Sequence, residues 1–135
     1  MSTENYIKIA QLKSVEAFQQ RSKEIGAEIP MDEAVLTAAE ASPMAQSIFV
    51  GGFEVGNRWC IHPMEGWDAN TDGSPTERTI RRWHNFGISG AKFIWGGEAA
   101  AVQADGRANP NQTLATPENE AGLKLLLDTL LAAHR

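Results

Sequence analysis

The pattern of hydrophobic and polar positions divides the chain into two parts. In residues 1–45, charged side chains interrupt the apolar positions, and the spacing predicts one helix over 15–25 and a second over 33–41. Ser14 and Asp32 stand at the N-cap positions of these helices, where a side-chain oxygen can accept a hydrogen bond from a backbone amide. The first part is therefore predicted to be a helical leader that carries no chemistry.

Residues 46–135 are predicted to contain short strands. Apolar residues on both sides of Gly51-Gly52 predict a hairpin over 48–55, because two glycines accommodate the backbone of a tight hairpin turn. The run 58–62 predicts a further strand. The mostly apolar run 90–96 predicts another, of the kind that is buried on both faces of a parallel sheet.

A helix is expected between these last two strands. Ser74 is placed at its N-cap, with Pro75 at the first helical position and Glu77 at the third. The spacing of Ile80 and Trp83 directs both toward the core. Three arginines are then left largely outward: Arg78, Arg81 and Arg82.

The last helix opens after Thr116-Pro117 and carries a broad leucine stripe, which is typical of a helix packed on a sheet. The order is thus strand, helix, strand, helix, with a long polar loop after each strand. This order predicts an α/β fold with parallel strands. In a (β/α) barrel ligands bind where strands end, so both loops are expected on one functional face.

Several residues of these loops could carry chemistry, and each also has a structural explanation. Glu65 and Glu98 follow the strand ends and could act as acids or bases, or could be solvated or cap an amide. Trp67 could stack on a planar ligand or cover the rim. Arg107 could pair with an anion or hold its own loop through carbonyl groups. Cys60, within a strand, is predicted to be a buried and inert thiol.

Composition narrows the class of protein. The 135 residues carry a net charge of −5, which offers no basic patch for nucleic acid or anionic lipid. No apolar run approaches the roughly 20 residues that span a bilayer, and the first residues lack the apolar core of a signal peptide. A single cysteine excludes an internal disulfide. No phosphate-loop or dinucleotide motif occurs, and no metal-ligand spacing. A cytoplasmic, enzyme-like domain is expected.

Ordered motifs give a more specific indication. They are Asn57-Arg58 before Pro63-Met64, Asp72-Gly73-Ser74-Pro75-Thr76, Ser89-Gly90-Ala91-Lys92, Glu98-Ala99 and Gly106-Arg107. With these motifs, residues 46–135 resemble the N-terminal part of the old yellow enzyme family. That family comprises flavin-dependent ene-reductases and NADH:flavin oxidoreductases built on an eightfold (β/α) barrel. The resemblance implies that this chain forms the first two strand–helix units of such a barrel, with the hairpin closing its bottom.

The resemblance also implies a cofactor and its contacts. FMN would lie over the strand ends, touched by Pro63, Met64, Glu65 and Ala99, and would pass hydride from NADH or NADPH to an activated alkene or similar acceptor. Trp67 would lie close enough to meet this small-molecule substrate. Glu65 departs from the family pattern, in which a small hydroxyl or thiol residue holds the flavin. A carboxylate beside the ring would lower the flavin potential unless it is protonated or turned away.

A complete barrel takes about 250 residues. The resemblance therefore implies that the catalytic residues lie beyond Arg135, in a remaining barrel segment, and that residues 1–135 alone are inactive and bind FMN weakly or not at all. Two other functions stay open. One is a non-catalytic fragment that binds a partner through its open sheet edges. The other is a flavin-free barrel lyase or aldolase that uses Glu65 or Glu98 as its base. The pattern leaves homo-oligomer formation undecided.

Overall fold

A computed structural model of the chain describes residues 6–134. It divides into two compact units, Met1–Leu36 and Thr37–Arg135. No helix among the described residues is both long and apolar enough to cross a bilayer.

The first unit contains helix α1, Val15–Glu24. The Ser14 hydroxyl accepts a hydrogen bond from the Ala17 amide at 3.2 Å, which satisfies one of the free amides at the helix start. Gly26, with a φ of 67°, ends the helix in the left-handed region that glycine adopts readily. The helix predicted over 15–25 is confirmed.

The second helix predicted for the leader is wrong. Only the 3₁₀ turn Ala38–Glu40 forms within 33–41. The Val35 side chain is 95% exposed, so the segment buries no apolar face that would stabilise a helix of this length. β-Branched residues such as Val35 and Thr37 further disfavour a short isolated helix.

The first strands of the second unit form the predicted hairpin. Strand β1, Ile48–Val50, pairs antiparallel with strand β2, Phe53–Val55. Gly51 and Gly52 join them with φ values of 56° and 92°, the positive angles that a tight turn between twisted strands requires.

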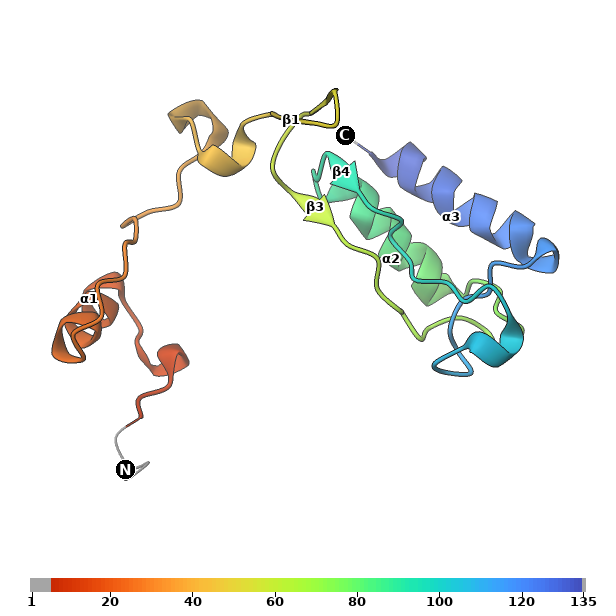
Figure 1. Cartoon of the computed structure of the whole chain (residues 1–135), viewed down its shortest axis with the longest axis horizontal. Helices are drawn as coiled ribbons and strands as arrows, with labels where there is room; N and C mark the ends of the chain where they lie inside the picture. Colours follow the sequence, from red (N-terminus) through yellow and green to blue (C-terminus); the bar gives the residue numbers. More distant parts are fainter. Residues whose placement is uncertain (1–5, 135) are drawn as a thin grey trace. The chain divides into compact units, whose positions relative to one another are not determined.

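The rest of this unit has the predicted α/β order. Strand β3, Cys60–Ile61, runs parallel to strand β4, Phe93–Ile94, and helix α2, Glu77–Ile88, connects them (Figure 1). Helix α3, Glu120–Ala133, follows and packs beside α2. Both strands are shorter than predicted. After β4, Gly96 and Gly97 have positive φ values of 75° and 64°, which turn the chain out of the strand.

The predicted burial of the second strand on both faces is also wrong. Phe93 and Ile94 are only half-buried, and Trp95 next to them is exposed. Ile94 packs against the core on the helix side. Among the described residues, β3 and β4 pair only with each other, so no further strand shields their outer edges.

Helix α2 begins two residues later than predicted. Its N-cap is Thr76, whose hydroxyl accepts from the Thr79 amide at 3.3 Å. Ser74 instead donates to Asp72 Oδ1 at 2.6 Å in the preceding loop. Ile80 and Trp83 face inward as predicted, and Thr79 is fully buried beside them.

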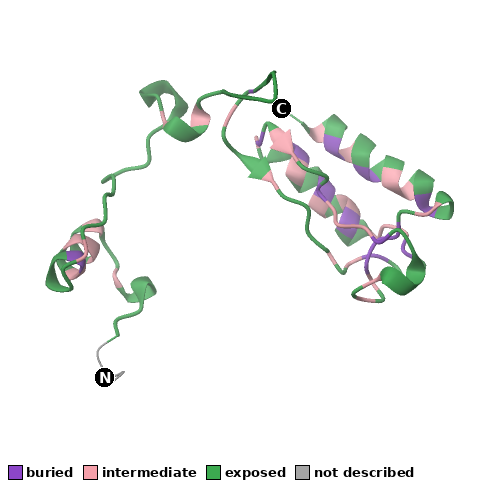
Figure 2. Cartoon of the chain, in the orientation of Figure 1, coloured by how far each residue is buried: buried purple, intermediate pink, exposed green. Residues whose placement is uncertain are grey.

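The core of the second unit lies between α2 and α3. Trp83, Leu126 and Leu130 form it, and buried positions occur along both helices (Figure 2). Gly87 lets the helices approach closely, because a Cβ there would lie 2.6 Å from the Leu130 carbonyl oxygen. The leucine stripe is only partly covered, since Leu127 remains half exposed on the same helix.

Candidate functional site

The segments that follow β3 and β4 lie side by side. The Ala99 amide donates to the Met64 carbonyl oxygen at 3.3 Å. The Gly66 amide donates to Glu98 Oε1 at 3.0 Å. Two hydrogen bonds therefore join the loop after β3 to the loop after β4. The prediction that these two corners share one edge of the sheet is confirmed, since both strands point the same way.

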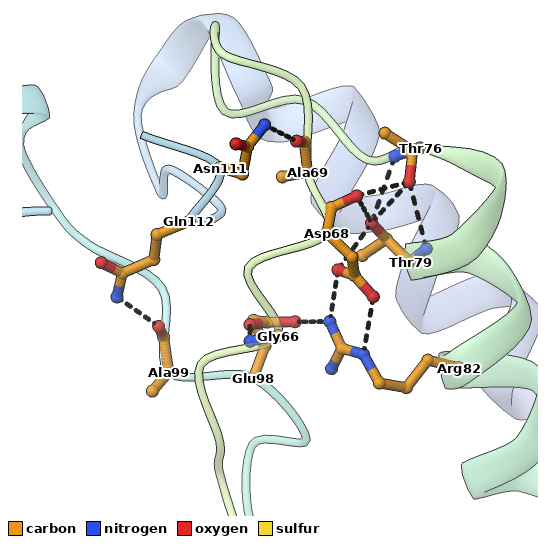
Figure 3. A network of polar contacts seen from close by, with 10 residues as sticks. All are labelled: Gly66, Asp68, Ala69, Thr76, Thr79, Arg82, Glu98, Ala99, Asn111 and Gln112. Carbon is orange, nitrogen blue, oxygen red and sulfur yellow. Dashed lines mark hydrogen bonds and ion pairs between the residues drawn. The ribbon is translucent and has the colours of Figure 1, made fainter. Parts of the chain in front are cut away.

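An arginine of α2 holds the same two loops (Figure 3). Arg82 Nε donates to Asp68 Oδ2 at 3.1 Å, and its Nη2 donates to Asp68 Oδ1 at 2.8 Å. The same Nη2 also donates to Glu98 Oε2 at 2.6 Å. We call Asp68, Arg82 and Glu98 the carboxylate–arginine cluster. The prediction that Arg82 faces outward is wrong, because two carboxylates that are distant in sequence reach it.

Hydroxyl groups of α2 complete the surroundings of Asp68. Thr79 Oγ1 donates to Asp68 Oδ1 at 3.0 Å, and Thr76 Oγ1 donates to the Asp68 carbonyl oxygen. Thr76, Thr79 and Arg82 are spaced three residues apart, so they share one face of the helix. This polar face, next to the apolar face of Trp83, was the available sequence signal for the cluster.

The cluster shifts the acidity of its members. The hydrogen bonds from Arg82 hold the pKa of Asp68 below its ordinary value, against the opposing effect of burial, and Thr79 adds to the lowering. Burial acts to lower the pKa of Arg82, but the hydrogen bonds to Asp68 and Glu98 outweigh it and leave that pKa raised. Asp68 and Arg82 are therefore both charged at neutral pH.

We expect a pH dependence of stability from Asp68. A carboxyl group whose pKa is lower in the folded state stabilises the fold above its unfolded pKa, which is near 3.8, and loses this contribution as the pH falls through the folded value. Urea denaturation between about pH 5 and pH 2 should therefore show a steeper loss of unfolding free energy for the wild type than for Asp68→Asn.

The matched control is Asp105→Asn, at an exposed carboxylate. It should keep the wild-type slope. Equal slopes for the wild type and Asp68→Asn would contradict the assignment of this acid-dependent stability to Asp68.

Glu98 is held on both oxygens, and only 3% of its side chain is exposed. Of the two explanations offered for it, capping an amide is the one that the geometry supports. A carboxylate that already accepts from Arg82 and Gly66 is poorly placed to take a proton from a substrate.

Glu65 and Trp67 interact with each other at the exposed edge of the corner. The Trp67 indole Nε1 donates to Glu65 Oε2 at 2.8 Å. Trp67 has a φ of 49°, in the left-handed region that non-glycine residues rarely adopt. The contact turns the Glu65 carboxylate toward the indole, and both side chains remain exposed.

The corner after β3 also has unused donors. Among the described residues, the amides of Met64 and Glu65 donate to no acceptor. A hollow of about 300 Å³ opens beside Met64, lined also by β3, Gly66, Arg82 and Phe86. Arg82 and Phe86 belong to α2, so this hollow lies on the helix side of β3.

Arg107 and Cys60, two other residues considered in the sequence analysis, have surroundings that differ from those of a binding or catalytic site. Arg107 donates to the Pro110 carbonyl oxygen of its own loop at 2.7 Å and to the Thr71 carbonyl oxygen at 2.8 Å, so it fixes its loop against the loop that precedes α2. Cys60 is exposed, and the prediction that its thiol is buried is wrong. Within residues 6–134 its strand pairs only with β4, which leaves the other edge of β3 unpaired.

The part of the chain that the structure describes holds no group of three His, Cys, Asp or Glu side chains arranged to bind a metal ion. The sequence matches no protein-family model and no curated protein.

Proposed function

We propose that this chain forms the first two strand–helix units of a (β/α) barrel in an FMN-dependent oxidoreductase of the old yellow enzyme type. In this proposal hydride passes from NADH or NADPH through FMN to an activated alkene or a similar small acceptor. The supporting observation is the close pairing of the two strand ends, joined by the bond from the Ala99 amide to the Met64 carbonyl oxygen. Strand ends on one rim are where barrel enzymes bind ligands.

The residues at this rim fit one part of an FMN site. The free amides of Met64 and Glu65 could donate to the polar edge of the ring, and Pro63 and Ala99 offer small apolar contacts beside them. FMN would supply the hydride-transfer chemistry, and the protein would bind and orient the ring. These residues do not enclose a ring system by themselves, so further protein segments must complete the FMN site.

The orientation of Glu65 is compatible with a flavin. Its carboxylate is bonded to Trp67, which directs it toward the indole. A carboxylate that is hydrogen-bonded to the Trp67 indole destabilises the reduced, anionic flavin ring less than a carboxylate that points at the ring. Trp67, exposed at the same rim, is the proposed contact for the substrate.

The exposed sheet supports the need for a remaining barrel segment. Parallel strands occur almost entirely in sheets that are covered on both faces, whereas Trp59 and Trp95 beside β3 and β4 are exposed. Further parallel strands would pair with the two outer edges and cover these indoles. The proposed setting of the assembled enzyme is the cytoplasm.

One alternative has an observation in its favour. The uncovered edges and indoles also suit a non-catalytic fragment that binds a partner protein by strand addition. A flavin-free lyase or aldolase is less supported, because Glu98 is engaged on both oxygens, which leaves Glu65 as its base.

FMN binding by the full-length polypeptide that carries this chain tests the proposal. We expect a yellow protein, and an FMN dissociation constant that rises about tenfold or more in Ala99→Leu, because the larger side chain would occupy the space of the ring. Residues 1–135 alone should bind FMN weakly or not at all. The measurements are the visible spectrum and a titration followed by flavin fluorescence.

The control is Ala108→Leu, at an exposed position in the polar loop. It should bind FMN like the wild type. A colourless full-length protein that resists FMN loading would contradict the proposal. Tight stoichiometric binding by residues 1–135 would contradict the expectation that further protein segments complete the FMN site.

A further inference from the structure

Arg82 connects a helix to both loops of the rim, and we propose that it is a positioning residue for the FMN site. Through Glu98 and Asp68 it sets the separation of the corners after β3 and β4, and thereby the affinity for the ring. This inference rests on the proposed function. It assigns a role to a residue that itself lies one step behind the ring contacts.

The Glu98 carboxylate is the centre of this arrangement. One oxygen accepts from Arg82 Nη2 at 2.6 Å and the other from the Gly66 amide at 3.0 Å. A single side chain therefore joins α2 to the loop after β3, while its own backbone belongs to the loop after β4. Hydrogen bonds between charged partners are short and strong, so they resist changes in these separations.

The hydrogen-bonded residues Gly66 and Glu98 are sequence neighbours of the proposed ring contacts. Gly66 directly follows Glu65, and Glu98 directly precedes Ala99. A displacement of either bonded residue must therefore move its neighbour, because one peptide bond connects them. This adjacency links the cluster to the site and distinguishes it from an ion pair elsewhere on the helix.

The cluster depends on one cation. Arg82 faces two carboxylates, and the exposed fractions of the three side chains are 24% for Arg82, 19% for Asp68 and 3% for Glu98. Removing the guanidinium would leave two negative charges close together and largely out of water, so they would repel each other. A lysine would keep one charge but not the planar fork that contacts both carboxylates at once.

Gly66 provides a second way to disturb the cluster without removing a charge. A Cβ at this position would lie 1.9 Å from Arg82 Nη2 and 2.8 Å from Asp68 Oδ1. An alanine methyl group would therefore push the guanidinium away from its carboxylates. At Gly106, a Cβ would meet nothing within 4 Å, which makes that glycine a matched control.

The experiment uses the full-length polypeptide with Arg82→Lys and Gly66→Ala, and with Arg81→Lys and Gly106→Ala as controls. FMN dissociation constants are measured well below each thermal midpoint, so that only folded protein is compared. Amide hydrogen exchange at Gly66 and Ala99 is measured on the same samples. We expect both test variants to bind FMN about tenfold more weakly and to exchange these amides about tenfold faster. The controls should match the wild type.

The outcomes separate this inference from the proposed function. A lowered midpoint with an unchanged FMN dissociation constant would show that Arg82 only stabilises the fold, and would overturn the inference while leaving the proposed function standing. Failure of the wild type to bind FMN would overturn both. Unchanged exchange at Gly66 and Ala99 would overturn the connection between Arg82 and the corners, with or without FMN.

Discussion

Leu126→Ala is expected to lower the free energy of unfolding by about 2–4 kcal/mol. Leu126 is 0% exposed and packs with Trp83 and Leu130 between α2 and α3. The substitution removes three buried carbon atoms and leaves a cavity that two helices in contact cannot fully close. Urea denaturation followed by circular dichroism measures the change.

The control is Leu127→Ala on the same helix, where the side chain is 49% exposed. It makes the same chemical change and should cost less than about 1 kcal/mol. Equal losses for the two variants would contradict the placement of the core on one face of α3.

The second large effect is expected from Gly87→Val, with a loss of about 2–3 kcal/mol. A Cβ at Gly87 would lie 2.6 Å from the Leu130 carbonyl oxygen and 2.7 Å from the Ala133 Cβ. The nearest of these atoms belongs to the α3 backbone, so the helices must move apart and the core must loosen. Thermal and urea denaturation both report this loss.

Gly106→Val serves as the comparison, since a Cβ there meets no atom within 4 Å. It controls for the effect of replacing glycine on the unfolded chain, where a side chain reduces backbone freedom. If Gly87→Val were as stable as Gly106→Val, the close approach of α2 and α3 at this glycine would be wrong.

Local signals were sufficient for much of the second unit. The paired glycines predicted the hairpin, and the apolar spacing placed Trp83 inward, because turns and helix faces depend on neighbours within a few residues. The adjacency of the corners after β3 and β4 followed from the strand–helix–strand order, since parallel strands end at the same edge.

The carboxylate–arginine cluster could not be predicted in the same way. Asp68 and Glu98 are 14 and 16 residues from Arg82, and neither lies in its helix. Their contact depends on the path of two loops, which sequence periodicity does not describe. Similarly, Cys60 was predicted to be buried because its strand was assumed to lie inside a sheet, whereas the paired sheet has only two strands among the described residues.

The uncovered outer edges of β3 and β4 have a consequence for handling the polypeptide. Unpaired backbone groups at a strand edge can template pairing with another chain, and the exposed indoles of Trp59 and Trp95 add apolar contact area beside them. The 135-residue chain should therefore self-associate as its concentration rises. Light scattering over a dilution series would detect this.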